Sequence, residues 1–165
     1  MVSKPSLENR KEQHYAAIRT AVPIPFGAYL QPLWDEVNGW LKTQGIASPG
    51  PAIIRYLTTD MSTKLDIDVG FVVDSPMPGN DRIISGILPA GRYATLLYIG
   101  PYKGKGIFKA IVALLDWAKE NGIVWNTTTR NGVEWWNGRV EWYLTDPAQE
   151  PDKKKYRTKL AFLVN

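Results

Sequence analysis

The chain has 165 residues, a formal net charge of +4, no cysteine and a single histidine, His14. The lack of cysteine excludes a disulfide scaffold, a thiolate nucleophile and a cysteine-ligated zinc or iron–sulfur centre. One histidine cannot build a histidine-rich metal centre, so we expect neither a metal nor a cofactor. The seven tryptophans and eight tyrosines are a large aromatic content for this length.

In chain order, the first predicted element is a strand over residues 15–22, which follows a polar N-terminal segment. Apolar side chains then recur at the spacing of one helix face over residues 30–41. Gly45 follows this run and suits the left-handed position that ends many helices. Two further runs, rich in apolar and β-branched residues, predict strands over residues 52–59 and 64–73.

The second half of the chain repeats this order of elements. A strand is predicted over residues 93–99, a helix over residues 107–118, and two strands over residues 140–145 and 155–164. The second helix has the same phase as the first and also ends before a glycine, Gly122. This internal similarity indicates a duplicated β-α-β-β unit.

We interpret residues 1–165 as one domain with pseudo-repeats at about 15–74 and 83–165, joined by the loop-forming stretch 74–82. One helix for every three strands cannot cover both faces of a sheet. We therefore predict an α+β fold in which an antiparallel sheet carries two helices on one face and a ligand groove on the other.

The segment 124–138 has no counterpart in the first half, and it contains Trp125, Trp135 and Trp136. Tryptophans in a chain of this size are mostly highly buried. The segment is predicted either to reach over the groove as a flap that carries part of a pocket wall, or to form a separate aromatic cluster.

Strand alternation predicts which residues line the groove, because successive side chains point to opposite faces. It places Arg139, Glu141 and Tyr143 on one face of their strand, and the repeat brings Tyr56 and Asp68 towards the same place. The apolar residues that alternate with Glu141 are expected to face the helices. Alternatively, Glu141 is a solvent-facing residue on a half-exposed sheet.

Aromatic rings and a carboxylate in one cleft suit a flat, lipophilic and often cationic ligand. The rings attract positive charge, and a desolvated carboxylate adds a long-range attraction. The same carboxylate, with its pKa raised by apolar walls, can instead orient or deprotonate a water.

Several partners and locations are not expected. The basic residues are scattered apart from Lys153–Lys155, which we interpret as a solvated loop, so no direct nucleic-acid partner is predicted. No stretch approaches the roughly 18 to 20 apolar residues of a membrane span, and the N-terminus lacks the apolar stretch of a secretion signal. We therefore expect a soluble, cytoplasmic protein without a membrane partner.

Two stretches, together with the duplicated unit, are similar to a known family. They are Gly100-Pro101-Tyr102 at the start of the second helix and the strand from Val140 to Pro147 with its Glu-x-Tyr-Leu pattern. Residues 15–165 thereby resemble the GyrI-like small-molecule-binding family, which includes the effector-binding domain of AraC-type and related multidrug-sensing regulators.

The resemblance implies a saddle-like sheet whose central groove binds lipophilic cations. It implies that Glu141 is the family's buried pocket glutamate and that Tyr143 and Tyr102 are its matching tyrosines. Tyr98 stands where many members have a histidine. No helix-turn-helix segment is recognisable beside the domain, so a one-component DNA-binding regulator is not expected.

The leading hypothesis is a stand-alone protein that binds bulky, planar, lipophilic and cationic small molecules, as in the sequestration of a drug or toxin. Glu141 supplies the negative charge in this hypothesis. The predicted ligand-binding residues are Tyr56, Asp68, Tyr98, Tyr102, Trp125, Trp136, Glu141 and Tyr143.

An alternative implied by the resemblance is an enzyme that hydrolyses cyclopropanoid, DNA-alkylating toxins. Glu141 is then the general base on water, and Tyr143 or Tyr98 hydrogen-bonds the developing oxyanion. A further alternative is a protein that inhibits DNA gyrase by direct interaction.

Overall fold

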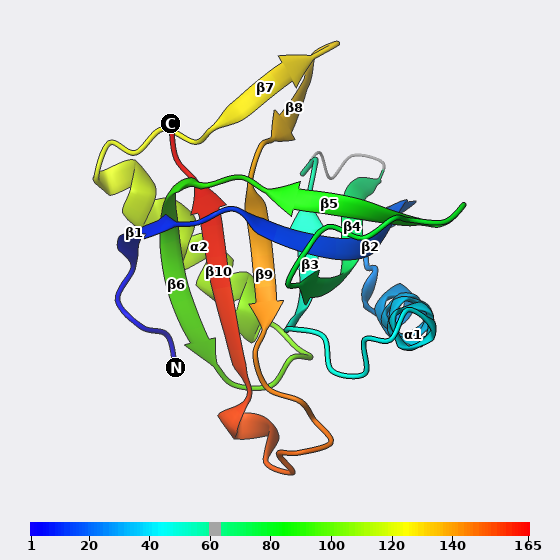
Figure 1. The fold of residues 1–165 in the computed structure, drawn as a ribbon. Helices are drawn as coiled ribbons and strands as arrows, with labels where there is room; N and C mark the ends of the chain where they lie inside the picture. Colours follow the sequence, from blue (N-terminus) through cyan, green and yellow to red (C-terminus); the bar gives the residue numbers. More distant parts are fainter. Residues whose placement is uncertain (60–63) are drawn as a thin grey trace.

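The computed structural model describes residues 1–59 and 64–165, and Figure 1 shows an antiparallel sheet with two helices beside it. Among these residues the sheet has eight strands in the order β1-β6-β10-β9-β3-β4-β2-β5, and a separate hairpin pairs β7 with β8. In chain order the elements are β1 (Ser6–Arg10), β2 (Gln13–Val22), α1 (Gly27–Thr43), β3 (Ala52–Tyr56), β4 (Leu65–Val73), β5 (Ile83–Leu88), β6 (Gly91–Ile99), α2 (Gly106–Glu120), β7 (Thr127–Arg130), β8 (Val133–Trp136), β9 (Arg139–Tyr143), a short 3-10 helix (Lys153–Lys155) and β10 (Arg157–Leu163).

The topology repeats itself, because β2-α1-β3-β4 and β6-α2-β9-β10 have the same order of elements. In each unit the last strand lies between the other two, and the units meet where β3 pairs with β9. Ile54 and Glu141 are direct partners in this central pair. The predicted α+β fold, with a duplicated β-α-β-β unit, an antiparallel sheet and two helices, is confirmed.

Both helices end as their glycines predict. Gly45 and Gly122 have φ angles of 84° and 65°, in the left-handed region that favours glycine. The next residues, Ile46 and Ile123, donate their backbone N–H groups to carbonyls five positions back, each at 2.9 Å. This bond closes a Schellman motif at each helix end. Neither helix of the described chain is long and apolar enough to cross a membrane.

The sequence patterns predict neither β1 nor β5. β1 directly precedes β2 in the chain, and β5 directly precedes β6. β2 pairs with β5 and β1 pairs with β6 in one continuous antiparallel register, in which Gln13 faces Leu88 and Arg10 faces Gly91. The resulting ribbon crosses over the other strands in Figure 1. It links the two edges of the sheet and folds over one of its faces.

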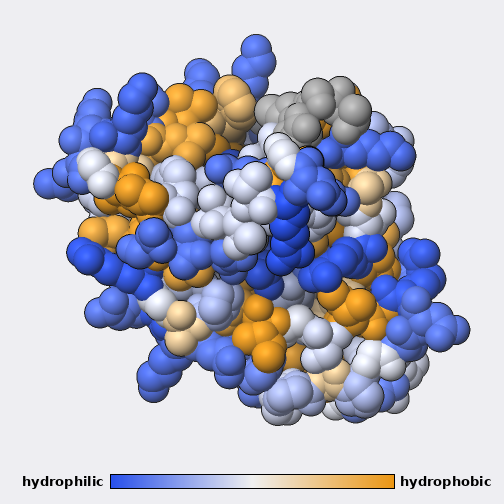
Figure 2. Space-filling model, turned by 90° about the horizontal axis from the view of Figure 1, so that it is seen from above, coloured by the Kyte–Doolittle hydropathy of each residue, from blue (hydrophilic) through white to orange (hydrophobic). Residues whose placement is uncertain are grey.

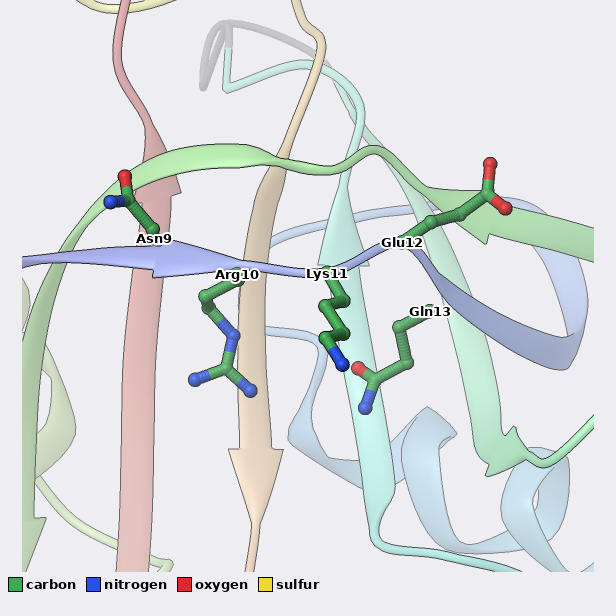
Figure 3. Close-up of a pocket in the computed structure, with 5 residues that line it drawn as sticks. All are labelled: Asn9, Arg10, Lys11, Glu12 and Gln13. Atoms are coloured by element: carbon green, nitrogen blue, oxygen red, sulfur yellow. The ribbon is translucent and has the colours of Figure 1, made fainter.

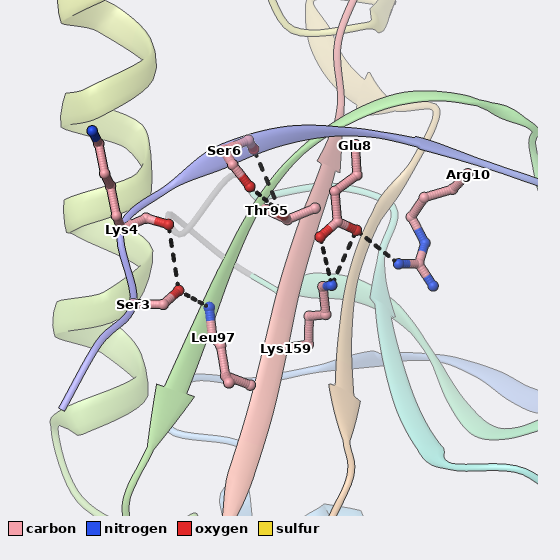
Figure 4. A network of polar contacts seen from close by, with 8 residues as sticks. All are labelled: Ser3, Lys4, Ser6, Glu8, Arg10, Thr95, Leu97 and Lys159. Atoms are coloured by element: carbon pink, nitrogen blue, oxygen red, sulfur yellow. Dashed lines mark hydrogen bonds and ion pairs between the residues drawn. The ribbon is translucent and has the colours of Figure 1, made fainter.

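Polar contacts hold β1 against the second repeat (Figure 4). Glu8 accepts hydrogen bonds from the Lys159 ammonium of β10 at 2.8 Å and from Arg10 at 3.1 Å. Ahead of the strand, the Ser3 hydroxyl oxygen accepts from the backbone N–H of Leu97 at 2.8 Å. The polar sequence of this segment therefore serves an edge strand and not a disordered tail.

Both helices pack on one face of the sheet. Cross-strand partners point to the same face, and the register places Glu141 in a row that crosses the central strands. The row consists of Ile18, Val69, Ile54, Glu141, Leu160 and Leu96. One end of this row packs with Val37 and Leu41 of α1, and the other end packs with Ala110 and Leu114 of α2. Glu141 thus lies on the helix side, between the strands under α1 and those under α2.

The opposite face carries a second core instead of a groove. Under the ribbon, Tyr15, Tyr93, Val140, Trp142 and Leu163 form one buried cluster with neighbouring apolar residues. The expectation that Val140 and Trp142 face the helices, and that Glu141 faces away from them, is wrong. Alternation separates the two sets of residues correctly, but both faces are covered, so hydrophobicity does not show which set meets the helices.

The insertion forms the β7–β8 hairpin. Asn131 and Gly132 at its tip both have positive φ angles, 51° and 77°, as a type I′ turn requires. The hairpin projects beyond one end of the sheet (Figure 1). Seen from that end, polar side chains cover most of the surface, and apolar side chains form separate patches (Figure 2). The base of the hairpin pairs with the chain after β3, where the backbone N–H of Trp136 donates to the carbonyl of Leu57, and its tip projects from the sheet instead of forming a flap across it.

Candidate functional site

The central feature of the helix side is a buried carboxylate. Glu141 is 1% exposed, and one of its oxygens, Oε1, accepts hydrogen bonds from the hydroxyl of Tyr143 at 2.7 Å and from that of Tyr56 at 3.2 Å. The other oxygen, Oε2, is buried and has no hydrogen-bond partner among the described residues. Glu141 is thus a buried carboxylate with hydrogen-bond donors on one oxygen and none on the other among the described residues.

The surroundings of Glu141 shift its proton affinity. Burial raises the pKa of this carboxyl, against the opposing effects of the Tyr143 hydrogen bond, the Arg139 charge and the Tyr56 hydrogen bond. Burial and the nearby Glu141 charge also raise the pKa of Tyr56 and of Tyr143 well above their usual value. Both tyrosines are therefore neutral donors near pH 7, and Glu141 takes up a proton more readily than an exposed glutamate.

Aromatic rings surround this carboxylate. Trp34 of α1 packs edge-on against Tyr143 with ring centroids 5.2 Å apart, and Phe26, just before α1, packs edge-on against Tyr56 at 6.3 Å. Tyr102, in the loop before α2, meets Tyr143 at 5.1 Å. Such edge-to-face contacts are favourable beyond the area they bury. The site is thus an aromatic chamber that α1 covers.

Tyr102 is held in place by its own hydrogen bonds. Its hydroxyl donates to the carbonyl of Thr145 at 2.6 Å and accepts from the backbone N–H of the same residue at 2.9 Å. The residue expected from the Gly-Pro-Tyr element therefore fixes the chain just after β9 and forms a wall of the site.

A buried arginine, which the site prediction did not include, lies beside this chamber. Arg139 is 8% exposed, and its guanidinium carbon lies 4.4 Å from the ring centroid of Phe162, 4.6 Å from that of Trp136 and 5.5 Å from that of Tyr56. Its Nε has no hydrogen-bond partner among the described residues. Burial lowers the pKa of Arg139, although the nearby phenol of Tyr56 and the charge of Glu141 act in the opposite direction. Alternation places Arg139 on the face of Glu141, but nothing in the sequence predicts its burial.

Two predicted residues lie in the cluster next to the chamber. Tyr98 is on the helix side, but its ring packs under α2, and Gly100 and Gly106 wrap around its hydroxyl so closely that neither has room for a side chain. Trp125 stacks 5.7 Å from Trp136 and 5.6 Å from Phe162. It therefore belongs to the cluster of rings that contacts Arg139.

Asp68 lies on the opposite face of the sheet and does not join the site. It is fully buried and accepts hydrogen bonds from the Tyr15 hydroxyl at 2.5 Å and from Nε and a terminal nitrogen of Arg19 at 2.8 Å and 3.0 Å. Burial and the Asp68 charge raise the pKa of Tyr15 to about 12. The placement of Asp68 near Glu141 is therefore wrong, because adjacent rows of the sheet point to opposite faces.

A surface hollow of about 290 Å³ lies elsewhere, on the ribbon between β1 and β2. Residues 9–13 line it, and Figure 3 shows Arg10, Lys11 and Gln13 on one side of the strand, with Asn9 and Glu12 on the other. None of these residues belongs to the aromatic chamber. The rings of the chamber pack against one another in this structure.

The sequence model of a protein family, the GyrI-like small molecule binding domain, matches residues 3–164. The chain belongs to this GyrI-like family. No curated protein matches it. The GyrI-like assignment agrees with the duplicated fold and with a glutamate buried among aromatic rings.

Solved structures show the same fold. The C-terminal domain of EcmrR is 18% identical, with a TM-score of 0.73 over 98% of this chain and 97% of that domain. In the EcmrR–DNA complex, a chain that is 19% identical aligns with a TM-score of 0.76 over 98% of this chain, which spans 57% of that one.

SAV2435, in a structure bound to tetraphenylphosphonium, is 10% identical, with a TM-score of 0.60 over 99% of this chain and 94% of that one. A hydrolase from Listeria innocua is 12% identical, with a TM-score of 0.58 over 98% of this chain and 92% of that one. At these identities the likeness shows the fold alone.

Proposed function

We propose that this GyrI-like domain binds bulky, planar, lipophilic small molecules, cations among them, in the aromatic chamber around Glu141. The observation that carries the proposal is the buried carboxylate, whose Oε1 accepts two tyrosine hydroxyls while Oε2 has no partner among the described residues. A buried acceptor without a partner costs roughly 1–3 kcal/mol. A ligand that brings a donor or a positive charge to Oε2 recovers that cost.

The walls of the chamber supply the lipophilic part of binding. Phe26 and Trp34 pack edge-on against Tyr56 and Tyr143, so a flat ligand that stacks on the two tyrosines takes the place of these rings. Aromatic faces attract cations, and the effect grows when the cation is desolvated. The tetraphenylphosphonium bound to SAV2435 is a bulky lipophilic cation with four aromatic rings, although it is tetrahedral and not flat.

Tryptophan fluorescence tests the proposal, because Trp34 and Trp136 lie at the chamber. Titration with tetraphenylphosphonium is expected to quench the wild type, and Glu141→Gln is expected to weaken binding at least about tenfold. Glu120→Gln, at the exposed end of α2, is the matched control and should bind as the wild type does. Equal affinities for wild type and Glu141→Gln would remove Glu141 from the site.

The raised pKa and the free Oε2 of Glu141 also favour a second candidate, the hydrolysis of a cyclopropanoid toxin. Glu141 takes the proton of a water whose oxygen bonds to a ring carbon. The ring C–C bond then breaks towards a conjugated oxygen, which takes up the proton that Glu141 removed from the water. Tyr143 turns its hydroxyl from Glu141, to which it donates in this structure, towards that oxygen. Mass spectrometry that detects a product heavier by one water, absent with Glu141→Gln, tests this candidate against simple binding.

The chamber leaves Tyr143 and Tyr56 as the hydroxyls next to Glu141, because Tyr98 packs under α2. Inhibition of DNA gyrase and a cytoplasmic location stay predictions. A supercoiling assay with excess protein tests the former.

A further inference from the structure

Two buried polar atoms of opposite kind lie two residues apart on β9. Nε of Arg139 is a donor and Oε2 of Glu141 is an acceptor, and each lacks a hydrogen-bond partner among the described residues. Residues i and i+2 of a strand point to the same face, so both belong to the helix side. No ion pair within 4.0 Å joins the two side chains in this part of the chain.

Arg139 occupies part of the aromatic surface that a ligand cation would use. Its guanidinium lies over the rings of Phe162, Trp136 and Tyr56. Tyr56 also donates to Glu141, so the ring that faces the arginine is part of the carboxylate's own shell. A buried cation therefore already lies at the edge of the chamber, against one of the rings that surround its carboxylate.

The two charges act on an incoming ligand in opposite directions. A permanent cation is attracted by Glu141 and repelled by Arg139, and at this degree of burial each effect is larger than in water. Such a cation also brings no acceptor for Nε. An uncharged ligand with one donor and one acceptor avoids the repulsion and satisfies both buried atoms, each of which is costly to leave unpaired.

We propose that the preferred ligands are bulky aromatic molecules that are uncharged or zwitterionic, with a hydrogen-bond donor for Glu141 and an acceptor for Arg139. Arg139 is then the residue that makes the site discriminate against permanent cations. This inference rests on the proposed function and narrows its ligand class.

The test compares two probes of similar bulk. Tetraphenylphosphonium is a permanent cation without a donor, and triphenylacetamide is uncharged and has one amide donor–acceptor group. Fluorescence titration of the wild type is expected to give tighter binding of the amide. Arg139→Met should tighten tetraphenylphosphonium binding about tenfold or more and weaken amide binding, because it removes both the repulsion and the donor.

Three further variants separate charge from shape. Arg139→Lys keeps the charge and should keep tetraphenylphosphonium binding weak. Arg139→Gln removes the charge but keeps a side-chain donor, so it should tighten tetraphenylphosphonium binding as Arg139→Met does. The matched control is Arg130→Met, which removes an exposed arginine that stacks 5.5 Å from Trp135, outside the chamber. It should change neither affinity. Circular dichroism identifies folded variants, and either neutral replacement suffices for the test.

The outcomes distinguish this inference from the proposed function. If Glu141→Gln weakens tetraphenylphosphonium binding but neither neutral replacement of Arg139 strengthens it beyond twofold, the inference is wrong and the proposed function stands. The inference is also wrong if the wild type prefers the cation to the amide. If neither probe binds the wild type, or if Glu141→Gln changes neither affinity, the proposed function fails and this inference fails with it.

Discussion

Each face of the central sheet buries one carboxylate, and the two carboxylates differ in their hydrogen-bond partners. Asp68, which is fully buried, accepts a tyrosine hydroxyl and two nitrogens of one arginine, so both of its oxygens are satisfied. Glu141, which is 1% exposed, accepts two tyrosine hydroxyls on one oxygen and nothing on the other among the described residues. Equal burial therefore accompanies a complete ion pair on one face and an open acceptor on the other.

The neighbouring arginines show the same contrast. Arg19 forks onto Asp68, and its side chain is 53% exposed, so much of the cation stays hydrated. Arg139 is buried and stacked on aromatic rings, without an ion pair to Glu141. Removing one partner of a buried ion pair costs stability, because it leaves the other charge unpaired. A buried charge that is only partly satisfied is typical of functional sites.

The largest expected effect is on stability, and it differs between the two carboxylates. Asp68→Asn removes one partner of the ion pair and is expected to lower the free energy of unfolding by about 2–3 kcal/mol, less than for a fully buried pair because Arg19 is half-exposed. Glu141→Gln is expected to leave it unchanged or to raise it by up to about 1 kcal/mol, because a buried charge is removed. Urea denaturation at pH 7 measures both. Similar losses in the two variants would contradict the contrast.

The contrast was only partly predictable from the sequence. Helical periodicity, the glycine after each helix and the runs of apolar and β-branched residues predicted both helices and the six strands of the duplicated unit, since these signals are local. The strands β1 and β5 were not predicted, because their polar or short sequences become strands through pairing with β6 and β2. That pairing covers the second face, which alternation cannot show.

The site residues, too, were only partly predictable from the sequence. Glu141, Tyr143 and Tyr56 were predicted to come together from alternation and the repeat, and the structure joins them by hydrogen bonds. Asp68 was expected beside Glu141 but lies on the opposite face of the sheet, because Glu141 faces the helices and Asp68 does not. Arg139 was missed as a site residue because its burial depends on Phe162 and Trp136, which reach it from β10 and the end of β8.

The next effect concerns the hydroxyl that each carboxylate accepts. Tyr15→Phe removes a hydrogen bond to a charged acceptor and also leaves Arg55 without the oxygen that it contacts at 3.1 Å. We expect a loss of about 1.5 kcal/mol in the free energy of unfolding. Tyr143→Phe is expected to cost less stability, since Tyr56 still donates to Glu141, but to weaken ligand binding several-fold. Denaturation and fluorescence titration of both variants give the comparison, and a larger stability loss for Tyr143→Phe would reverse it.

The smallest expected effect is a dependence of stability on pH that arises from Glu141. Burial raises the pKa of Glu141 above its ordinary value of 4.5, so the folded protein keeps this proton at pH values where the unfolded chain has released it. The folded state then binds more protons, and the stability of the wild type falls as the pH rises through that window. Glu141→Gln lacks this proton, so its stability relative to the wild type should increase from pH 4.5 upwards and level off above the raised pKa.

Urea denaturation of wild type and Glu141→Gln between about pH 4 and 8 measures this difference, with Glu120→Gln as the exposed control. A bound ligand that donates to Oε2 should reduce the difference, because it stabilises the charged carboxylate that the apo chamber disfavours. A difference between the two proteins that is independent of pH would mean that Glu141 titrates like an exposed glutamate. The chamber would then lack the buried, half-satisfied charge on which its selectivity depends.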